Sequence, residues 1–571
     1  MKKILALALS LLTFSFCTQN VNAQNYKEYD IYVEKPAQVA GNRFFHNAKF
    51  EPKTGFYIGI YAEGDTTLHN WNSGSYEDWY FGRVPIVLGK DHAAYLLYVD
   101  YAKPDAISHY AAADELGKIM GIALEPRAGL DSVKNDAHLH DLAKQAKKAG
   151  VPILLRFANE MNDSSAPWYK DGPEKYKAKF KIVSDVFHKE APNVAMLWSP
   201  NDWLIGTEHQ YYPGDQYVDW VGVSSYPPFL SNGQPKHGNT WIDRFRKIYD
   251  AYGSKKPIML SEGAPIANVE YSSQNVTAQA KDELERFYAS VPRRYPNVKL
   301  IVYWNNSEDY GALRHCKLTD NPPMQQSYMK AIQDPYYISD EGKSSNIYYE
   351  KVAQTTLGVG TEKISALAND PTKVTKVAYL INGKGVAEGK FPDYTANIDF
   401  SKYAGQRIDL RADFYNGANK YVTSKSVNVQ VTNQAPATSS AQPPNSTKTT
   451  QTKVVPRNDI KIIVKGETVK SDAQPFIENG RTYLPIRAIS ESMGVKVDWN
   501  AENKLVTLTS NNGIIVFVIN QDKYMVNGEP KSLDAPAKIV NGRTYLPVRA
   551  VGEALNLNVN WDGASKTVTL D

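Results

Sequence analysis

Residues 151–163 read VPILLRFANEMND, and this stretch decides the fold. A nearly continuous apolar run carries Arg156, and Asn159 and Glu160 follow directly after it. Such a run, closed by polar residues, is typical of a strand in a parallel sheet that helices cover on both faces. Polar groups that follow a buried strand favour a functional site at its carboxyl end.

Seven more runs of the same kind lie between about residues 50 and 335. They read GFYIGIYA, AAYLLYVD, GKIMGIALE, VAMLWSP, VDWVGVSSY, KPIMLSE and KLIVYWN. Helical segments separate several of them; in AHLHDLAKQAKKAG, Leu142, Ala146 and Ala149 fall on one face. Eight strand–helix units predict an α/β protein with a (β/α)8 TIM barrel over residues 24–345.

Two carboxyl groups at predicted strand ends suggest chemistry. Glu160 follows the fourth strand and Glu262 the seventh, so both face the same end of the barrel. A retaining glycosidase needs such a pair, one as acid/base and one as nucleophile. We assign binding or structural roles to the competing carboxylates, which are Glu63, Glu125, Asp202 and Asp215.

Other polar and aromatic residues complete the predicted site. The Tyr226 hydroxyl is expected to keep Glu262 ionised, Asn159 to donate to the sugar 2-hydroxyl, and Trp304 to form the floor under the reacting sugar. Arg156 is expected to support the nearby carboxylates or to contact substrate, and Trp203 to bind substrate at the fifth strand end. We expect no metal or other cofactor.

Three stretches resemble glycoside hydrolase family 26. They are VPILLRFANEMNDSSAPWY at 151–169, APNVAMLWSPND at 191–202 and YYPGDQYVDWVGVSSY at 211–226. The resemblance implies an endo-acting β-glycanase: a β-mannanase foremost, or a mixed-linkage glucanase or β-1,3-xylanase. It also implies Glu160 as acid/base, Glu262 as nucleophile, Tyr226 as the nucleophile's partner, Trp304 as a platform and Trp168 as a rim aromatic.

One position departs from the pattern of that family. Many of its mannanases carry histidine directly before the acid/base glutamate, whereas this chain has Asn159. The departure leaves the hydrolytic chemistry intact but weakens the assignment to mannan.

The residues after the barrel predict three further parts. We expect a connector at 346–365 and an immunoglobulin-like β-sandwich at 366–432, where short apolar–polar alternations are separated by Gly and Asn. Residues 433–455 are rich in Ser, Thr, Pro and Gln and read as a linker.

The last region, 456–571, contains an internal repeat. NGRTYLPIRA at 479–488 returns as NGRTYLPVRA at 541–550. The two copies resemble copper amine oxidase N-terminal-like domains, also called stalk domains. The region has neither His nor Cys, which argues against a copper enzyme. We expect the repeats to act in attachment or spacing on cell-wall polymer.

The amino-terminal segment predicts a secreted protein. Residues 1–23 carry two lysines, an apolar run and a small residue at the end, the pattern of a secretory signal peptide; Cys17 raises a lipid anchor as the alternative. Without this segment Cys316 is the only cysteine, so no intrachain disulfide can form. The net charge of +4 without a basic stripe excludes nucleic acid as an expected partner.

The sequence therefore supports two classes of function. The first is a secreted retaining endo-β-glycanase with a polysaccharide substrate, which its repeats are expected to attach to the cell wall. The second is a surface protein that binds glycan on the same barrel without turnover, against which the presence of both glutamates counts.

Overall fold

The structure is a computed structural model of the whole chain. It describes residues 27–68, 80–103, 107, 117–202, 206–227, 230–231, 234–235, 240–269, 274–306, 316–370, 373–436, 460–469, 471, 473–478, 481–500, 505–510, 513–519, 523–526, 529–533, 535–540, 543–555, 557–563 and 565–571. The predicted signal peptide and most of the predicted linker lie outside these ranges. Within them, no helix has the length and apolarity that crossing a bilayer requires.

Eight parallel strands form a closed barrel, as predicted. In chain order they are β2 (Phe56–Tyr61), β3 (Ala94–Asp100), β4 (Ile119–Glu125), β5 (Ile153–Phe157), β6 (Val194–Trp198), β7 (Trp220–Ser224), β10 (Ile258–Gly263) and β13 (Val298–Trp304). Each strand pairs with the next in sequence, and β13 pairs with β2 to close the ring. Because all strands run the same way, their carboxyl ends meet at one mouth.

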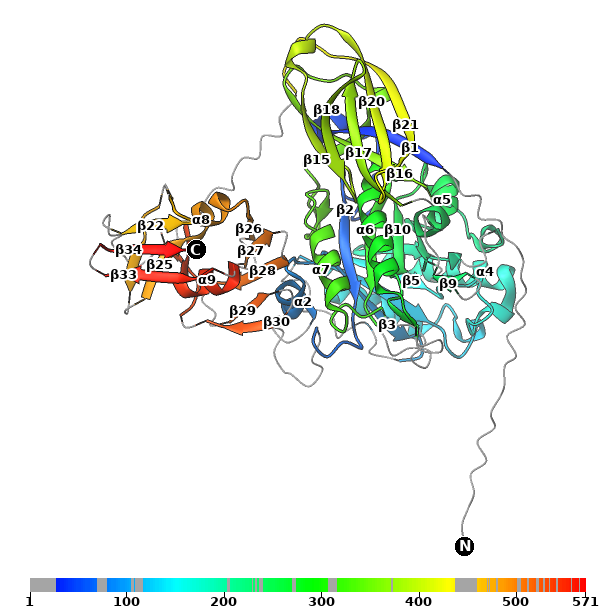
Figure 1. The fold of residues 1–571 in the computed structure, drawn as a ribbon. Helices are drawn as coiled ribbons and strands as arrows, with labels where there is room; N and C mark the ends of the chain where they lie inside the picture. Colours follow the sequence, from blue (N-terminus) through cyan, green and yellow to red (C-terminus); the bar gives the residue numbers. More distant parts are fainter. Residues whose placement is uncertain are drawn as a thin grey trace.

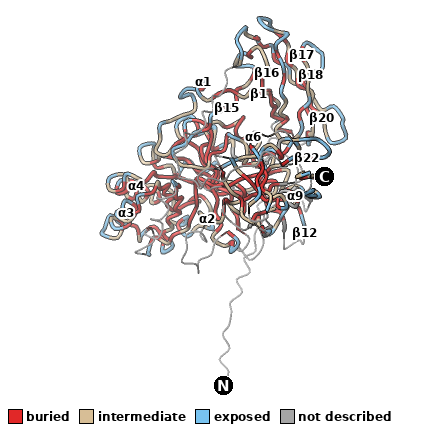
Figure 2. The backbone as a smooth tube through the Cα atoms, turned by 90° about the vertical axis from the view of Figure 1, so that its left-hand side faces the viewer, coloured by how far each residue is buried: buried red, intermediate tan, exposed pale blue. Residues whose placement is uncertain are grey.

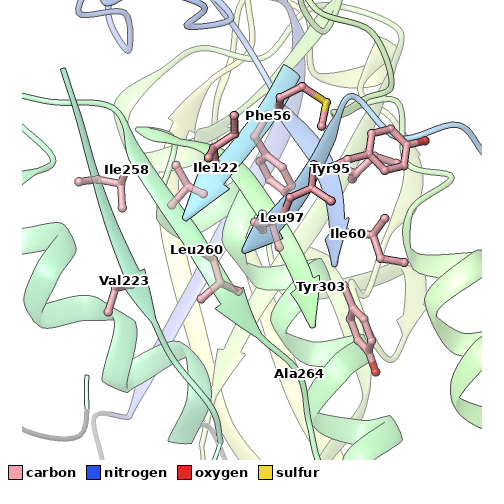
Figure 3. Close-up of a cluster of buried hydrophobic side chains, with 14 of the residues drawn as sticks. Phe56, Ile60, Tyr95, Leu97, Ile122, Val223, Ile258, Leu260, Ala264 and Tyr303 are labelled. Carbon is pink, nitrogen blue, oxygen red and sulfur yellow. The ribbon is translucent and has the colours of Figure 1, made fainter. Parts of the chain in front are cut away.

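The barrel has two apolar layers because successive side chains along a strand point in opposite directions. Tyr57, Leu96 and Met259 belong to the cluster inside the ring. Ile58, Leu97 and their equivalents belong to the cluster that surrounds it, several members of which are labelled in Figure 3. The strands are therefore buried on both sides, as their sequence suggested.

Helices cover the outside of the barrel (Figure 1). They are α2 (Tyr80–Leu88), α3 (Ala137–Ala149), α4 (Gly172–Glu190), α5 (Thr240–Tyr252), α6 (Thr277–Arg294) and α7 (Pro322–Ala331). In α3, Asp136 caps the amino end by accepting from the Leu139 amide, and Gly150 ends the helix at φ 75°. The predicted face of Leu142, Ala146 and Ala149 is buried, which confirms the helical reading.

The β-sandwich differs from its predicted extent. Its strands are β1 (Glu28–Pro36), β15 (Ile347–Lys351), β16 (Thr361–Asn369), β17 (Val374–Ile381), β18 (Lys384–Lys390), β19 (Ala396–Asp399), β20 (Arg407–Asn416) and β21 (Tyr421–Gln430). Thus 346–365, expected as a connector, holds β15 and the start of β16. The first strand of the described residues, β1, lies between β15 and β16 in one sheet, where Figure 1 draws it blue among later strands.

The barrel is therefore inserted between two parts of the sandwich. The chain leaves the sandwich after β1, builds the barrel and returns through β15. Helix α6 ties the two parts together: Arg294 lies 2.9 Å from Glu28, and Arg293 donates to Ser365 over 2.9 Å. In Figure 2 buried segments run through both parts.

The repeat region forms a β-rich unit with one short helix per copy. The elements are β22 (Lys461–Val464), β23 (Glu467–Thr468), β24 (Phe476–Glu478), β25 (Arg481–Pro485), α8 (Ile486–Ser492), β26 (Lys496–Asn500), β27 (Leu505–Ser510), β28 (Gly513–Val518), β29 (Lys523–Val526), β30 (Glu529–Ser532), β31 (Lys538–Val540), β32 (Arg543–Pro547), α9 (Val548–Leu555), β33 (Val559–Asp562) and β34 (Thr567–Leu570). The two copies meet through β25 and β32, which pair antiparallel at Leu484 and Leu546.

This unit contacts the barrel on the side of α2 and α7. Leu505, Ile514 and Val516 join the apolar cluster that surrounds the barrel. The Thr507 hydroxyl donates to the Gly89 carbonyl over 3.2 Å, in a turn just before β3. Gly89 precedes the amino end of a barrel strand, so the contact lies away from the mouth.

Candidate active site

Arg156 occupies the centre of the barrel mouth. Its side chain is fully buried on β5, and its guanidinium reaches two carboxyl groups: Nη1 lies 2.6 Å from Glu262 Oε1, and Nη2 lies 3.8 Å from Glu160 Oε1. The two glutamates singled out from the sequence therefore share one cation. Because Arg156 is covered on all sides, it acts as a support for the carboxylates and not as a surface for substrate.

Glu262 is held in its ionised form. It lies on β10 near the end of the strand and accepts from the Ser224 hydroxyl over 3.0 Å and from the Tyr226 hydroxyl over 3.4 Å. A third hydroxyl, that of Tyr98, also bonds to it. Burial by itself would raise the pKa of Glu262, but Arg156 and the hydroxyls of Tyr98 and Ser224 bring it below its ordinary value.

Glu160 has the opposite electrostatic surroundings. Burial, and then the negative charge of Glu262, raise its pKa to about 7, against the pull of Arg156. The side chain keeps 23% of its surface exposed, so it opens to the mouth. At neutral pH one carboxyl group is thus ionised and its neighbour holds a proton for part of the time.

The backbone around Glu160 is strained. Ala158 and Glu160 have φ values of 44° and 55°, which side chains other than glycine rarely adopt. The Ala158 amide donates to Leu124 on one neighbouring strand end, and the Glu160 amide donates to Ser199 on the other, over 3.0 and 2.9 Å. These two bonds fix the turn that presents Glu160, and such strain is common at functional sites.

The prediction for Trp168 is wrong. It was expected as a rim aromatic in contact with substrate, but it is only 3% exposed and joins the apolar layer around the barrel. Its indole nitrogen donates to the Asn159 carbonyl over 2.9 Å. The ring therefore holds the segment that carries Asn159 and Glu160 in place from behind.

Asn159 lies directly before Glu160 in the chain. It is 6% exposed, and its side-chain oxygen Oδ1 is buried without a hydrogen-bond partner. A buried polar atom without a partner is uncommon in folded proteins and needs an explanation. Oδ1 can only accept, so a sugar hydroxyl that donates to it would be such a partner, whereas the predicted donation to the 2-hydroxyl would come from the side-chain amide nitrogen.

Three aromatic rings form one wall of the site. Trp304, at the end of β13, stacks on Tyr61 with 4.1 Å between ring centroids and an interplanar angle of 13°. Tyr98 meets Trp304 edge-on at 5.7 Å. The Trp304 ring is partly exposed and rigidly backed, which suits the predicted platform for a sugar face.

The sequence reasoning gave no role to three groups that the structure brings into the site. Tyr98 bonds to Glu262, Ser224 bonds to Glu262 and Arg156, and Asn201 bonds to Glu160. Tyr98 shares strand parity with Ala94 and Leu96, which line the barrel interior, and this parity is the signal that could have identified it.

Three other residues considered in the sequence have different positions. Asp202 is structural, because Arg244 and Ser225 occupy its carboxylate. Glu125 pairs with Arg127 at 2.9 Å beside the mouth. Trp203 lies outside the described residues, so its predicted role in substrate binding stays a prediction.

A closed (β/α)8 barrel with two carboxyl groups of opposed pKa at its carboxyl-terminal mouth is the arrangement of a glycoside hydrolase. Comparison with known families agrees: residues 128–287 match the model of Glycosyl hydrolase family 26, and residues 463–570 that of the Copper amine oxidase N-terminal domain. The barrel thus carries a domain of glycosyl hydrolase family 26, and both resemblances seen in the sequence are confirmed.

Individual relatives are distant. Endoglucanase H of Acetivibrio thermocellus is 25% identical over 38% of this chain and 24% of its own length. A β-1,3-xylanase of a Vibrio species is 24% identical over 36% of this chain and 49% of its own length. The chain thus spans a quarter to a half of these relatives. Among solved structures, a Cellulomonas fimi endo-β-1,4-mannanase double mutant is 16% identical, covers 66% of this chain and 94% of its own, and has a TM-score of 0.38.

Proposed function

We propose that the protein is a secreted retaining endo-β-glycanase with Glu262 as nucleophile and Glu160 as acid/base. One observation carries the proposal: a single buried guanidinium lies 2.6 Å from Glu262 and 3.8 Å from Glu160, and the two carboxyl groups have pKa values shifted in opposite directions. Retaining hydrolysis needs one ionised and one protonated carboxyl group on the same pocket.

The first half of the reaction uses both groups at once. A Glu262 oxygen attacks the anomeric carbon while the Glu160 proton moves to the glycosidic oxygen, and the bond to the leaving sugar breaks. Oε1 of Glu262 lies against Arg156 and Ser224 at 2.6 and 3.0 Å, whereas Tyr226 is 3.4 Å from Oε2. We therefore assign Oε2, the oxygen outside the 2.6 Å contact with Arg156, as the attacking atom.

The second half releases the sugar. Glu160, now ionised, takes a proton from water while the water oxygen bonds to the anomeric carbon and the ester to Glu262 breaks. We assign Asn159 as the donor to the 2-hydroxyl of the reacting sugar and Trp304 as the ring that stacks against its face; the burial of Asn159 and the stacking of Trp304 on Tyr61 support these roles. The enzyme returns to its starting protonation state.

β-Mannan is the first substrate that we propose, because the family resemblance points foremost to mannanases. Mixed-linkage glucan and β-1,3-xylan are the second candidates. They gain support from the relatives named above, an endoglucanase and a β-1,3-xylanase, and from Asn159 in place of the mannanase histidine.

The test measures reducing ends released from mannan, mixed-linkage glucan and β-1,3-xylan. We expect turnover of one of the three by the wild type and none above background by Glu262→Ala. Equal activity of Glu262→Ala and wild type, or no release from any of the three, contradicts the proposal. The matched control is Glu125→Gln, because this carboxyl group also lies beside the mouth but is paired with Arg127.

For the repeat region we propose attachment to a wall polysaccharide. Trp499 and Trp561, related by the repeat, are 37% and 38% exposed, whereas Trp198, Trp220 and Trp241 of the barrel are buried. Exposed indole rings suit the apolar faces of sugars. Sedimentation of Glu262→Ala with insoluble cell wall measures this: Trp499→Ala together with Trp561→Ala should reduce the bound fraction severalfold, and an unchanged fraction contradicts attachment through these rings.

A further inference from the structure

The Ser224 hydroxyl lies at the junction of the two carboxyl groups and their shared cation. It accepts from Arg156 Nη2 over 2.5 Å and donates to Glu262 Oε1 over 3.0 Å. It is also close enough to Glu160 to lower the pKa of that carboxyl group. The same nitrogen, Nη2, lies 3.8 Å from Glu160 Oε1, so Ser224 and Glu160 meet around one corner of the guanidinium.

A serine hydroxyl carries only one proton and can donate to only one carboxylate at a time. Ser224 is fully buried, so no exchange with bulk water interferes with this choice. Arg156 occupies its acceptor side in either orientation. The donated proton therefore goes to whichever carboxyl group carries the negative charge.

We propose that the Ser224 hydroxyl turns from Glu262 to Glu160 during the reaction and back again, so that it follows the negative charge between the two half-reactions. The inference rests on the function proposed above. In the free enzyme Glu262 is ionised and receives the bond. In the glycosyl-enzyme Glu262 is a neutral ester and Glu160, having lost its proton to the leaving sugar, receives it.

The turn moves no proton between groups, since the O–H bond of Ser224 stays intact. Its effect is to stabilise ionised Glu160 in the glycosyl-enzyme, which is the form that must accept a proton from water. Tyr226 offers a contrast, because its hydroxyl bonds to Glu262 Oε2 and serves the nucleophile alone.

The test compares Ser224→Ala with Tyr226→Phe in the full chain. The substrate is a 2,4-dinitrophenyl β-glycoside of the sugar that the wild type releases. Its leaving group needs no acid, so the burst phase reports attack by Glu262 and the steady-state kcat reports hydrolysis of the intermediate. Both are measured against pH.

Both variants should move the acidic limb of the burst rate to higher pH, because each removes a donor from Glu262. Only Ser224→Ala should also move the acidic limb of kcat upward, by about one pH unit, since Glu160 loses its donor in the intermediate. A kcat limb of Ser224→Ala that coincides with that of the wild type overturns the inference and leaves Ser224 as a support for Glu262 only.

Two controls separate a role of Ser224 from misfolding of the variant and from failure of the proposed function. If thermal melting shows that Ser224→Ala does not fold, Ser224→Cys, a weaker donor of similar volume, should shift the same kcat limb by a smaller amount, and an unmoved limb again overturns the inference. Absence of any burst in the wild type indicates failure of the proposed function, and it is distinct from a burst with an unmoved kcat limb.

Discussion

At the scale of single residues, the buried Arg156 guanidinium contacts both carboxyl groups of the site, but at unequal distances. Arg156 lies closer to Glu262 than to Glu160, and the hydroxyls of Tyr98 and Ser224 also lower the pKa of Glu262. A buried charge that is paired and hydrogen-bonded tolerates its desolvation, whereas its neighbour in the same pocket then keeps a proton. The division of labour between the carboxyl groups follows from this asymmetry.

The pH profile of kcat/KM should show the asymmetry directly. We expect a bell with its basic limb near pH 7, set by Glu160, and its acidic limb below pH 4.5, set by Glu262. Glu160→Gln should lose the basic limb and about 10²–10⁴ in rate on the polysaccharide. A basic limb that persists in Glu160→Gln would show that another group supplies the proton.

The same residue should affect stability. The pKa of Glu160 is raised from 4.5 to about 7 on folding, so between these pH values the folded state binds more protons than the unfolded state. The free energy of unfolding should therefore fall as pH rises through this window. Urea denaturation of wild type and Glu160→Gln at pH 4 and pH 8 measures the effect. Glu160 should lower the free energy of unfolding of the wild type by at most roughly 3 kcal/mol between these pH values, and this contribution should be absent from the variant. Parallel pH dependence of the two proteins contradicts the assignment.

Residue identity predicted the two carboxyl groups but not all of their surroundings. Glu160 follows β5 and Glu262 stands near the carboxyl end of β10, where the fold itself places them at the mouth. Tyr98 was not predicted as a site residue because it lies within β3, before the polar residues at the end of the strand. Trp168 was misread because the sequence does not reveal that its ring turns back under the Asn159 carbonyl.

At the scale of elements, the spacing of β7 against β10 fixes the position of Glu262. A Cβ on Gly222 would come within 2.1 Å of Ser261 Oγ and 3.0 Å of Leu197 Cδ1. Ser261 precedes Glu262 and bonds to Ser199 inside the barrel over 2.9 Å. Because Gly222 on β7 has no side chain, Ser261 on β10 can pack against it inside the barrel.

Gly222→Ala should displace the Ser261 and Leu197 side chains inside the barrel. We expect a loss of about 1–3 kcal/mol in the free energy of unfolding, measured in urea, together with a lower kcat because Glu262 moves relative to Arg156. Gly385→Ala is the control: it lies on β18 of the sandwich, where no atom lies within 4 Å of the added Cβ. If Gly222→Ala has the stability and kcat of the wild type, the barrel interior accommodates the added methyl group and the prediction is wrong.

Local pattern predicted the barrel strands well and the sandwich less well. Each barrel strand is a short apolar run whose partner is the next run in sequence. Strand β1 instead pairs with residues more than 300 positions away, as in Tyr32 with Lys351 and Val33 with Ile364. The local sequence around β1 can indicate a strand but not which distant strands it pairs with, so its place in the sandwich could not be predicted.

At the scale of the whole molecule, the insertion of the barrel into the sandwich makes the two mutually dependent. Both ends of the barrel segment are anchored in one sheet, through β1 and β15. Ion pairs and hydrogen bonds from α6 add to this anchoring. Catalysis at the mouth should therefore be lost when the sandwich is disrupted.

Val33→Asp tests this coupling. Val33 is fully buried in the sandwich core, so an unpaired carboxylate there should cost at least about 3 kcal/mol. We expect hydrolysis and barrel tryptophan fluorescence to be lost in one transition at a lower urea concentration. Val386→Asp, at a position 41% exposed on the same sandwich, should change little. Separate transitions for the two signals would show that the barrel folds independently.

The central claim, double displacement through Glu262, is tested most directly by following the anomeric configuration of the product by proton NMR during hydrolysis of the preferred polysaccharide. The β-anomer should appear first and then mutarotate to the equilibrium mixture. Trapping with a 2-deoxy-2-fluoro glycoside should place the label on Glu262 in peptide mass spectrometry. First release of the α-anomer, or a label on any other residue, would contradict the account.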